Sequence, residues 1–129
     1  MDFQEFKKIG AEIKADFPAL NYGKGYDNCF MINDYEPGQL QTAAQLYSSA
    51  SGRQLEVLTT QPAVQIYTGN WLEGCPAGKC GRGYHDYEGV AIECQHCPDS
   101  PNKPEFPTTV LRPGETFSEA IIWAFSVRK

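Results

Sequence analysis

Side chains suited to holding a polyhydroxylated ligand gather in three short runs of this 129-residue chain. The runs are Gly25 to Asn28, Thr60 to Asn70, and Glu93 to Asn102. In an extended strand, Gln65 and Tyr67 would point to one face, and so would Glu93 and Gln95. Amide and carboxylate groups at inward-looking strand positions need hydrogen-bonding partners, and the hydroxyls of a sugar supply them. The sequence therefore favours a carbohydrate pocket with Gln95 as one contact.

Aromatic residues close to the same runs support this interpretation. Tyr26, Tyr67, Trp71 and Tyr84 offer flat apolar faces for the C–H side of a sugar ring. We expect Tyr67, which shares a strand with Gln65, to be a substrate contact.

Short strands joined by tight turns are expected to position these residues. Alternating or apolar runs predict strands at 29–32, 39–48, 53–60, 63–68, 89–95 and 119–127. Ser51-Gly52 separates two of them and predicts a hairpin. Phe3, Phe6, Ile9, Ile13 and Phe17 follow helical spacing, so residues 3–17 are expected to form an amphipathic helix that ends at Pro18. The fold class expected is an all-β antiparallel sandwich, in one domain over residues 1–129.

Composition and charge exclude several classes of function. A formal net charge of −5 gives no basic excess to neutralise a phosphate backbone, so we expect no nucleic-acid partner. No apolar run approaches the ~18 residues of a membrane span, and Met1 is not followed by a signal-type segment. Five cysteines, an odd number, argue against a closed disulfide framework. A reducing cytoplasm is the expected location.

Three longer runs carry a resemblance to a known family. They are GYDNCF at 25–30, SGRQLEVLTTQPAVQIYTGNWLEG at 51–74, and GVAIECQHCPDSPNKPEFPTTVLRPGE at 89–115. The chain resembles the C-terminal portion of the aldose 1-epimerase (galactose mutarotase) family, in order and with similar loop spacing. The segment MDFQEFKKIG at 1–10 also resembles a family segment that leads towards the GYD motif.

The resemblance implies a fold and a set of site residues. It implies part of a large antiparallel β-sandwich, with Glu93 matching the general base, and Asp27 and Gln65 matching sugar contacts. The general-acid histidine, a second pocket histidine and a substrate-binding arginine belong to the N-terminal portion, which this chain does not match. No cofactor is implied, and the implied substrate is a hexose such as glucose or galactose.

The implied reaction opens a hemiacetal and closes it again. A base takes the proton from the C1 hydroxyl while an acid gives one to the ring oxygen. His96 lies three residues after Glu93 and would point to the opposite face if the strand continues. His85 lies in a long loop and could fold over a pocket. We interpret both as exposed or locally bonded histidines rather than as replacement acids.

Each chemical interpretation has a structural alternative. Glu93 could pair with Arg53 or Arg82, Asp27 could brace a turn, and Gln65 could bond only to backbone. Asp99-Ser100 is interpreted as a turn outside the site. Cys75, Cys80, Cys94 and Cys97 offer four thiolates, but the family needs no metal, so we expect free thiols and no metal site.

Three functional hypotheses remain from the sequence. The first is an aldose 1-epimerase-type protein reduced to its C-terminal part. The second is a non-catalytic carbohydrate-binding module or fragment. The third is a subunit that pairs with a separate N-terminal half. Because part of a sandwich leaves strand edges and an apolar face uncovered, we expect a homo-oligomer or cover by the missing N-terminal half.

Overall fold

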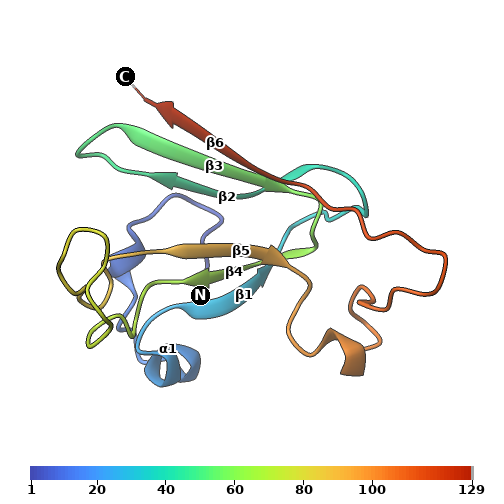
Figure 1. The fold of residues 1–129 in the computed structure, drawn as a ribbon, viewed down its shortest axis with the longest axis horizontal. Coiled ribbons are helices and arrows are strands. Elements are labelled where there is room, and N and C mark those ends of the chain that lie inside the picture. The colour runs from blue at the N-terminus through green and yellow to red at the C-terminus, as the bar shows by residue number, and fades with distance from the viewer. Residues whose placement is uncertain (129) are drawn as a thin grey trace. The chain divides into compact units, whose positions relative to one another are not determined.

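The computed structural model describes residues 1–128 and consists mainly of β-strands. Its elements are η1 (Ile9–Ala11), α1 (Pro18–Gly23), β1 (Asp27–Met31), β2 (Gln41–Tyr47), β3 (Arg53–Thr59), β4 (Ala63–Tyr67), β5 (Ala91–Gln95), η2 (Ser100–Asn102) and β6 (Ile121–Val127). One three-stranded sheet has the order β1-β4-β5 and the other has the order β2-β3-β6 (Figure 1). All six expected strands are present, and the expected all-β, sandwich-like class is confirmed.

The described residues form two compact units. One unit comprises residues 1–28 and 66–92, and the other comprises residues 29–65 and 93–129. The boundaries between them fall within β1, β4 and β5. The single domain expected over 1–129 therefore stays a prediction.

The hairpin expected at Ser51-Gly52 joins β2 to β3. The two strands are antiparallel, with Tyr47 opposite Gln54 next to the turn. Gly52 has a φ of +70°, and a Cβ added there would lie 2.7 Å from the carbonyl oxygen of Arg128. Both the positive φ and the close approach require glycine, so this residue fixes the turn and with it the register of the strands.

Strand β3 lies between β2 and β6, as Figure 1 shows, and pairs antiparallel with both. The expected alternation along β3 is present. Val57 and Thr59 are almost completely buried, whereas Glu56 and Leu58, on the other face, are half-buried. One face of this sheet therefore contributes to the core.

The helix expected over residues 3–17 is wrong. That segment contains only the short turn η1, and Phe6 and Phe17 are exposed. The α-helix instead begins at Pro18, which occupies its first position, where a fixed φ and a missing N–H are tolerated. Phe17 is extended, at φ −137° and ψ 130°, as a residue before proline prefers. The helical spacing of apolar residues is not enough here, because these side chains stay largely exposed and give the segment no packed face.

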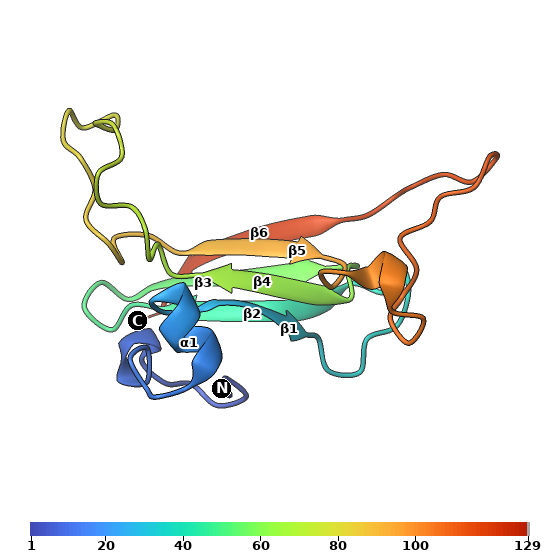
Figure 2. The ribbon, with the colours of Figure 1, turned by 90° about the horizontal axis from the view of Figure 1, so that it is seen from below.

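Long loops separate the later strands. Residues 68–90 connect β4 to β5, and residues 96–120 connect β5 to β6 with only η2 as regular structure. Figure 2 shows the second loop, in orange to red, extending beyond the strand ends before β6. Within residues 1–128, no helix is long and apolar enough to cross a membrane.

Candidate functional site

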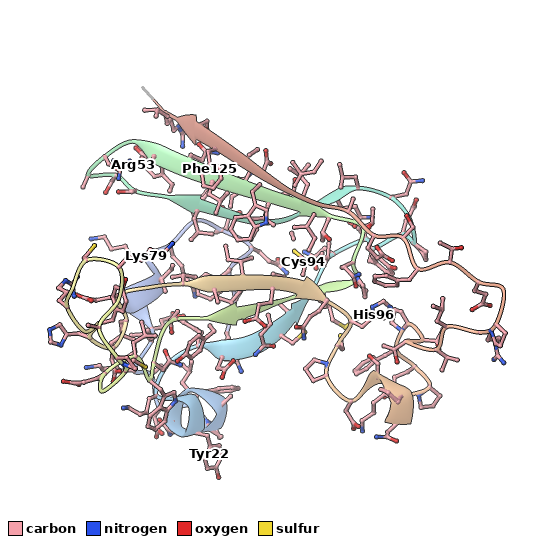
Figure 3. All side chains as sticks on the ribbon, in the orientation of Figure 1. Tyr22, Arg53, Lys79, Cys94, His96 and Phe125 are labelled. Atoms are coloured by element: carbon pink, nitrogen blue, oxygen red, sulfur yellow. The ribbon has the colours of Figure 1, made fainter. Side chains whose placement is uncertain are left out.

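Glu93 lies on β5 with its side chain exposed. The neighbouring Cys94 points to the side of β5 that faces the sheet β2-β3-β6 (Figure 3). Burial raises the pKa of the Cys94 thiol, and a hydrogen bond with the Thr59 side chain acts in the opposite direction. Because side chains alternate along a strand, Glu93 and the half-buried Gln95 lie on the opposite face.

Gln65 lies on β4, the central strand of the sheet β1-β4-β5. It is half-buried and follows the buried Ala63 and Val64. The strand order places Gln65 on the strand next to the one that carries Glu93 and Gln95. Its part in sugar binding, like that of Glu93, stays a prediction.

Asp27 is exposed at the start of β1, and the backbone before it is firmly held. The backbone N–H of Tyr26 donates to Thr68 Oγ1 at 3.1 Å, and Thr68 N–H donates to the Tyr26 carbonyl at 3.0 Å. Gly25 has a φ of +150°, and a Cβ there would lie 2.6 Å from Asn70 Oδ1. The GYD segment therefore needs its glycine because buried side chains press against it.

Asn70 is the main support of this segment, and sequence reasoning did not assign it. It is completely buried. Its Nδ2 donates to the carbonyls of Gly23 at 2.7 Å and Tyr26 at 2.9 Å, and its Oδ1 accepts from Thr68 Oγ1 at 2.5 Å. A polar residue directly after Gly69, at the end of an apolar strand, was the available signal.

The four aromatic residues considered as faces for a sugar ring differ in their exposure. Tyr26 is wrong as a sugar platform, because it is 1% exposed and Phe3 packs against its ring at 5.0 Å. Trp71 is exposed and not part of the core. Tyr67 is half-buried, and its hydroxyl accepts the Trp71 backbone N–H at 3.0 Å. Tyr84 packs against Gly78 and has the Arg82 guanidinium 5.5 Å from its ring centroid.

An ion pair ties the first long loop to the GYD segment. Lys24 Nζ lies 3.2 Å from Asp86 Oδ2 and 4.0 Å from the centroid of the Trp71 ring. The Glu73 backbone N–H donates to the other oxygen of Asp86, and together with Lys24 it holds the pKa of that carboxyl below its usual range. The Tyr87 hydroxyl donates to the Lys24 carbonyl at 2.5 Å. The chain on both sides of Gly25 is thus fixed.

Of the two histidines, only His85 fits the expectation of an exposed or locally bonded ring, because His96 bonds to a residue 35 positions away in the chain. His96 is half-buried, and its Nδ1 lies 2.9 Å from Gln61 Oε1. His85 is exposed, with Nδ1 3.9 Å from Glu73 Oε1. Arg82 bonds to Glu88 at 2.7 Å, which disfavours it as the partner of Glu93.

The five cysteines are free thiols, and Cys94 on β5 has been described above. Cys75 and Cys80 are exposed in the first loop. Cys29 and Cys97 share a hydrogen bond, and burial, followed by Cys97, raises the pKa of Cys29 to about 11. Across residues 1–128, no three His, Cys, Asp or Glu side chains are grouped as metal ligands.

Asp99-Ser100 forms the turn that was expected. Asp99 has a φ of +63°, and the Ser100 hydroxyl donates to the Cys97 carbonyl at 2.6 Å. Asp99 Oδ1 accepts from Asn102 Nδ2. These contacts are all local, so the segment acts as a structural cap after β5.

The predicted site residues divide between the two units. Asp27 and Tyr67 belong to the first, and Gln65, Glu93 and Gln95 belong to the second. Asp27 lies on β1, Gln65 and Tyr67 lie on β4, and Glu93 and Gln95 lie on β5. Their joint role as a site stays a prediction.

Comparisons with known proteins give a consistent relationship. The family model for aldose 1-epimerase matches residues 1–123. Galactose mutarotase of Rattus norvegicus is 44% identical over 103 residues, which are 80% of this chain and 30% of that protein. Aldose 1-epimerase of Escherichia coli K12 is 40% identical over 126 residues, 96% of this chain and 36% of that protein.

A solved structure agrees with these sequence matches. The GalM/aldose epimerase homologue from C. elegans superimposes with a TM-score of 0.70 at 31% identity, over 81% of this chain and 30% of that one. This chain therefore spans about a third of the length of the relatives that it matches. Since the family match covers nearly every residue, the chain belongs to the aldose 1-epimerase family.

Proposed function

We propose that this chain supplies the base-bearing part of a mutarotase site, which interconverts the α and β anomers of a hexose such as glucose or galactose. Glu93 takes the proton from the C1 hydroxyl, and Asp27, Gln65, Tyr67 and Gln95 hold the other hydroxyls and the ring. The observation that carries the proposal is the exposed side chain of Glu93, which shares one face of β5 with Gln95.

Ring opening also needs an acid at the ring oxygen. Each positioned acid or base contributes roughly 10²–10⁴-fold to such a reaction. His85 is exposed and His96 is bonded to Gln61, so neither is an evident donor beside Glu93. The proposal therefore assigns the acid to a polypeptide corresponding to the rest of the relatives' length. No cofactor takes part in this chemistry.

A second candidate is sugar binding without catalysis. It is favoured by the contacts of the two histidines, because His96 Nδ1 lies against Gln61 Oε1 and His85 is exposed. The two candidates differ in whether Glu93 matters for rate or only for affinity. The five free thiols suit the cytoplasmic location that the sequence predicts.

Polarimetry tests the catalytic candidate. Freshly dissolved α-D-glucose and α-D-galactose would be followed in dilute buffer, since buffer acids and bases catalyse the same reaction. We expect Glu93→Gln to abolish any acceleration over background, because an amide does not accept the C1 proton. Glu36→Gln, which also removes an exposed carboxylate, is the matched control and should retain the rate.

Sugar binding is measured in parallel by amide chemical shifts in two-dimensional NMR. Shifts at Gln65, Glu93 and Gln95 without any rate would favour the binding candidate. A folded protein that shows neither shifts nor rate, alone or with the remaining segment of the bacterial relative, would refute both.

A further inference from the structure

Two of the five cysteines are in contact with each other, although they are far apart in the chain. Cys29 lies on β1 and is half-buried, and Cys97 lies two residues after the end of β5 and is 7% exposed. Their side chains share a hydrogen bond. Since β1 and β5 are the two outer strands of the sheet β1-β4-β5, this contact joins segments from either side of β4.

The other three cysteines have different surroundings. Cys94 points towards the sheet β2-β3-β6 (Figure 3), and its thiol hydrogen-bonds with the Thr59 side chain. Cys75 and Cys80 are exposed in the loop between β4 and β5, and Cys75 Sγ lies 3.9 Å from the carbonyl oxygen of Trp71. The sulfur atoms of Cys29 and Cys97 are therefore the pair best placed to react with each other.

The chain around Cys97 is held by contacts on both sides of this residue. His96 Nδ1 lies 2.9 Å from Gln61 Oε1, which anchors the preceding residue. The Ser100 hydroxyl donates to the Cys97 carbonyl at 2.6 Å, and the Ser100 N–H donates to the same oxygen at 3.3 Å. Because these contacts fix the main chain, the Cys97 sulfur is kept next to Cys29.

The contact also distinguishes the two thiols. Burial raises the pKa of Cys29 to about 11, and the charge of Cys97 and the hydrogen bond to it act in the same direction. Cys29 therefore keeps its proton beside a charged Cys97 and donates to it. Since the thiolate is the reactive form, Cys97 is the sulfur that attacks an oxidant, and Cys29 is the sulfur that resolves the product.

We propose that Cys29 and Cys97 form a redox modification site, at which a hydroperoxide converts the two neighbouring thiols into a disulfide. The site goes beyond the proposed function and does not depend on it. Hydrogen peroxide is small enough to reach a residue that is 7% exposed. A reducing cytoplasm, the location expected from the sequence, is where disulfides are usually transient and redox-sensing rather than structural.

The reaction balances with hydrogen peroxide as the oxidant. The Cys97 thiolate attacks one oxygen, the O–O bond breaks, and the departing hydroxide takes up the proton that Cys97 released, which gives water and a sulfenic acid. The Cys29 sulfur then attacks the Cys97 sulfur, the S–O bond breaks, and the departing oxygen leaves as water with the Cys29 proton. Two thiols are oxidised and one peroxide is reduced, and a dithiol reductant reverses the change by thiol–disulfide exchange.

Counting thiols in the full chain tests the proposal without sugar. Cys75→Ser and Cys80→Ser are combined first, because exposed thiols can join two molecules. The reduced protein is treated with hydrogen peroxide, denatured, alkylated and analysed by mass spectrometry. We expect two of the three remaining thiols to escape alkylation, the chain to stay a monomer on a non-reducing gel, and dithiothreitol to restore both thiols.

Matched variants identify the pair. Cys94→Ser should leave formation of the disulfide unchanged, and this control is needed because no Lys or Arg separates Cys94 from Cys97 in a tryptic digest. Cys29→Ser should abolish the disulfide and leave a sulfenic acid at Cys97, which dimedone traps. Cys97→Ser should also abolish it, with dimedone labelling of Cys29 lower by about tenfold or more than that of Cys97.

Denaturation gives a second measurement on the unsubstituted thiol pair. Because a bond between distant residues restricts the unfolded chain, the oxidised protein should unfold at a higher denaturant concentration than the reduced one. If circular dichroism shows that Cys97→Ser does not fold, Cys29→Ser at the half-buried position carries the test of the pair.

Three results would each overturn the proposal. The first is that all three thiols remain open to alkylation after peroxide treatment. The second is that Cys94→Ser prevents the disulfide, which would make Cys94 one of the partners. The third is that oxygen is added to Cys29 or Cys97 without any bond between them, which would mean that the two sulfur atoms do not meet.

Discussion

At the scale of single residues, Asn70 determines how the GYD segment is held. It is completely buried and bonds to two backbone carbonyls and one hydroxyl, all close to Asp27 in the chain or in the fold. Asp27 itself stays exposed at the start of β1. Asp27, which would contact sugar, is therefore positioned by Asn70, which would not.

Asn70→Ala should lower the free energy of unfolding by about 2 kcal/mol, because it leaves buried carbonyls without their donor. Chemical denaturation followed by circular dichroism measures the change. Asn102→Ala is the control, since Asn102 is exposed and bonds only locally to Asp99, and it should cost less than about 0.5 kcal/mol. Equal effects of the two changes would contradict the role given to Asn70.

At the scale of elements, the loop between β4 and β5 is fastened to the GYD segment by Lys24 and Asp86. The carboxyl of Asp86 accepts the Glu73 N–H at 2.9 Å and pairs with Lys24 at 3.2 Å. Both interactions favour the charged carboxylate and hold its pKa low. The loop should therefore respond to acid.

The direction of this response follows from the sign of the pKa shift. Because the pKa of the Asp86 carboxyl is lower in the folded protein than its value of about 3.9 in the unfolded chain, the charged carboxylate stabilises the folded loop above about pH 3.9. This stabilisation is lost as the pH falls through the pKa that the carboxyl has in the folded protein. Trp71 fluorescence reports the change, because the Lys24 ammonium lies 4.0 Å from its ring centroid. A Trp123→Phe background leaves Trp71 as the single tryptophan.

In that background, Asp86→Asn at pH 7 should reproduce the acid spectrum of the parent protein. Glu88→Gln is the matched control, because Glu88 is in the same loop but pairs with Arg82. A parent spectrum that stays constant from pH 7 down to the acid unfolding of the whole protein would show that the ion pair does not hold the loop.

At the scale of the whole molecule, the free thiols differ in reactivity. Cys75 and Cys80 are exposed, whereas Cys97 is buried and Cys29 and Cys94 are half-buried with raised pKa values. The thiolate is the reactive form. With a pKa of about 11, only about one Cys29 in a thousand is ionised at pH 8.

Titration with Ellman's reagent should therefore show two fast thiols and three slow ones in the native protein. All five should react at once in denaturant. Cys75→Ser and Cys80→Ser together should remove the fast phase, and Cys94→Ser should leave it intact. A third fast thiol in the native protein would contradict the burial of Cys29, Cys94 and Cys97.

The sequence by itself determined the six strands, the hairpin at Ser51-Gly52 and the family. These features depend on alternation, turn residues and long runs of identity, which are local or collinear in the chain. The helix expected over residues 3–17 is wrong because its apolar side chains stay largely exposed, and most helical stability comes from packing an apolar face.

Only the tertiary structure decided which of these side chains are buried and which are joined. Tyr26 proved to be core rather than a sugar platform, Lys24 met Asp86 across 62 residues, and Trp123 proved to be uncovered beside the buried Val57. The two-residue period of a strand predicts that the strand has two faces, but it does not predict which other segment of the chain covers each face. That choice is made by contacts between segments far apart in the chain, which no local pattern encodes.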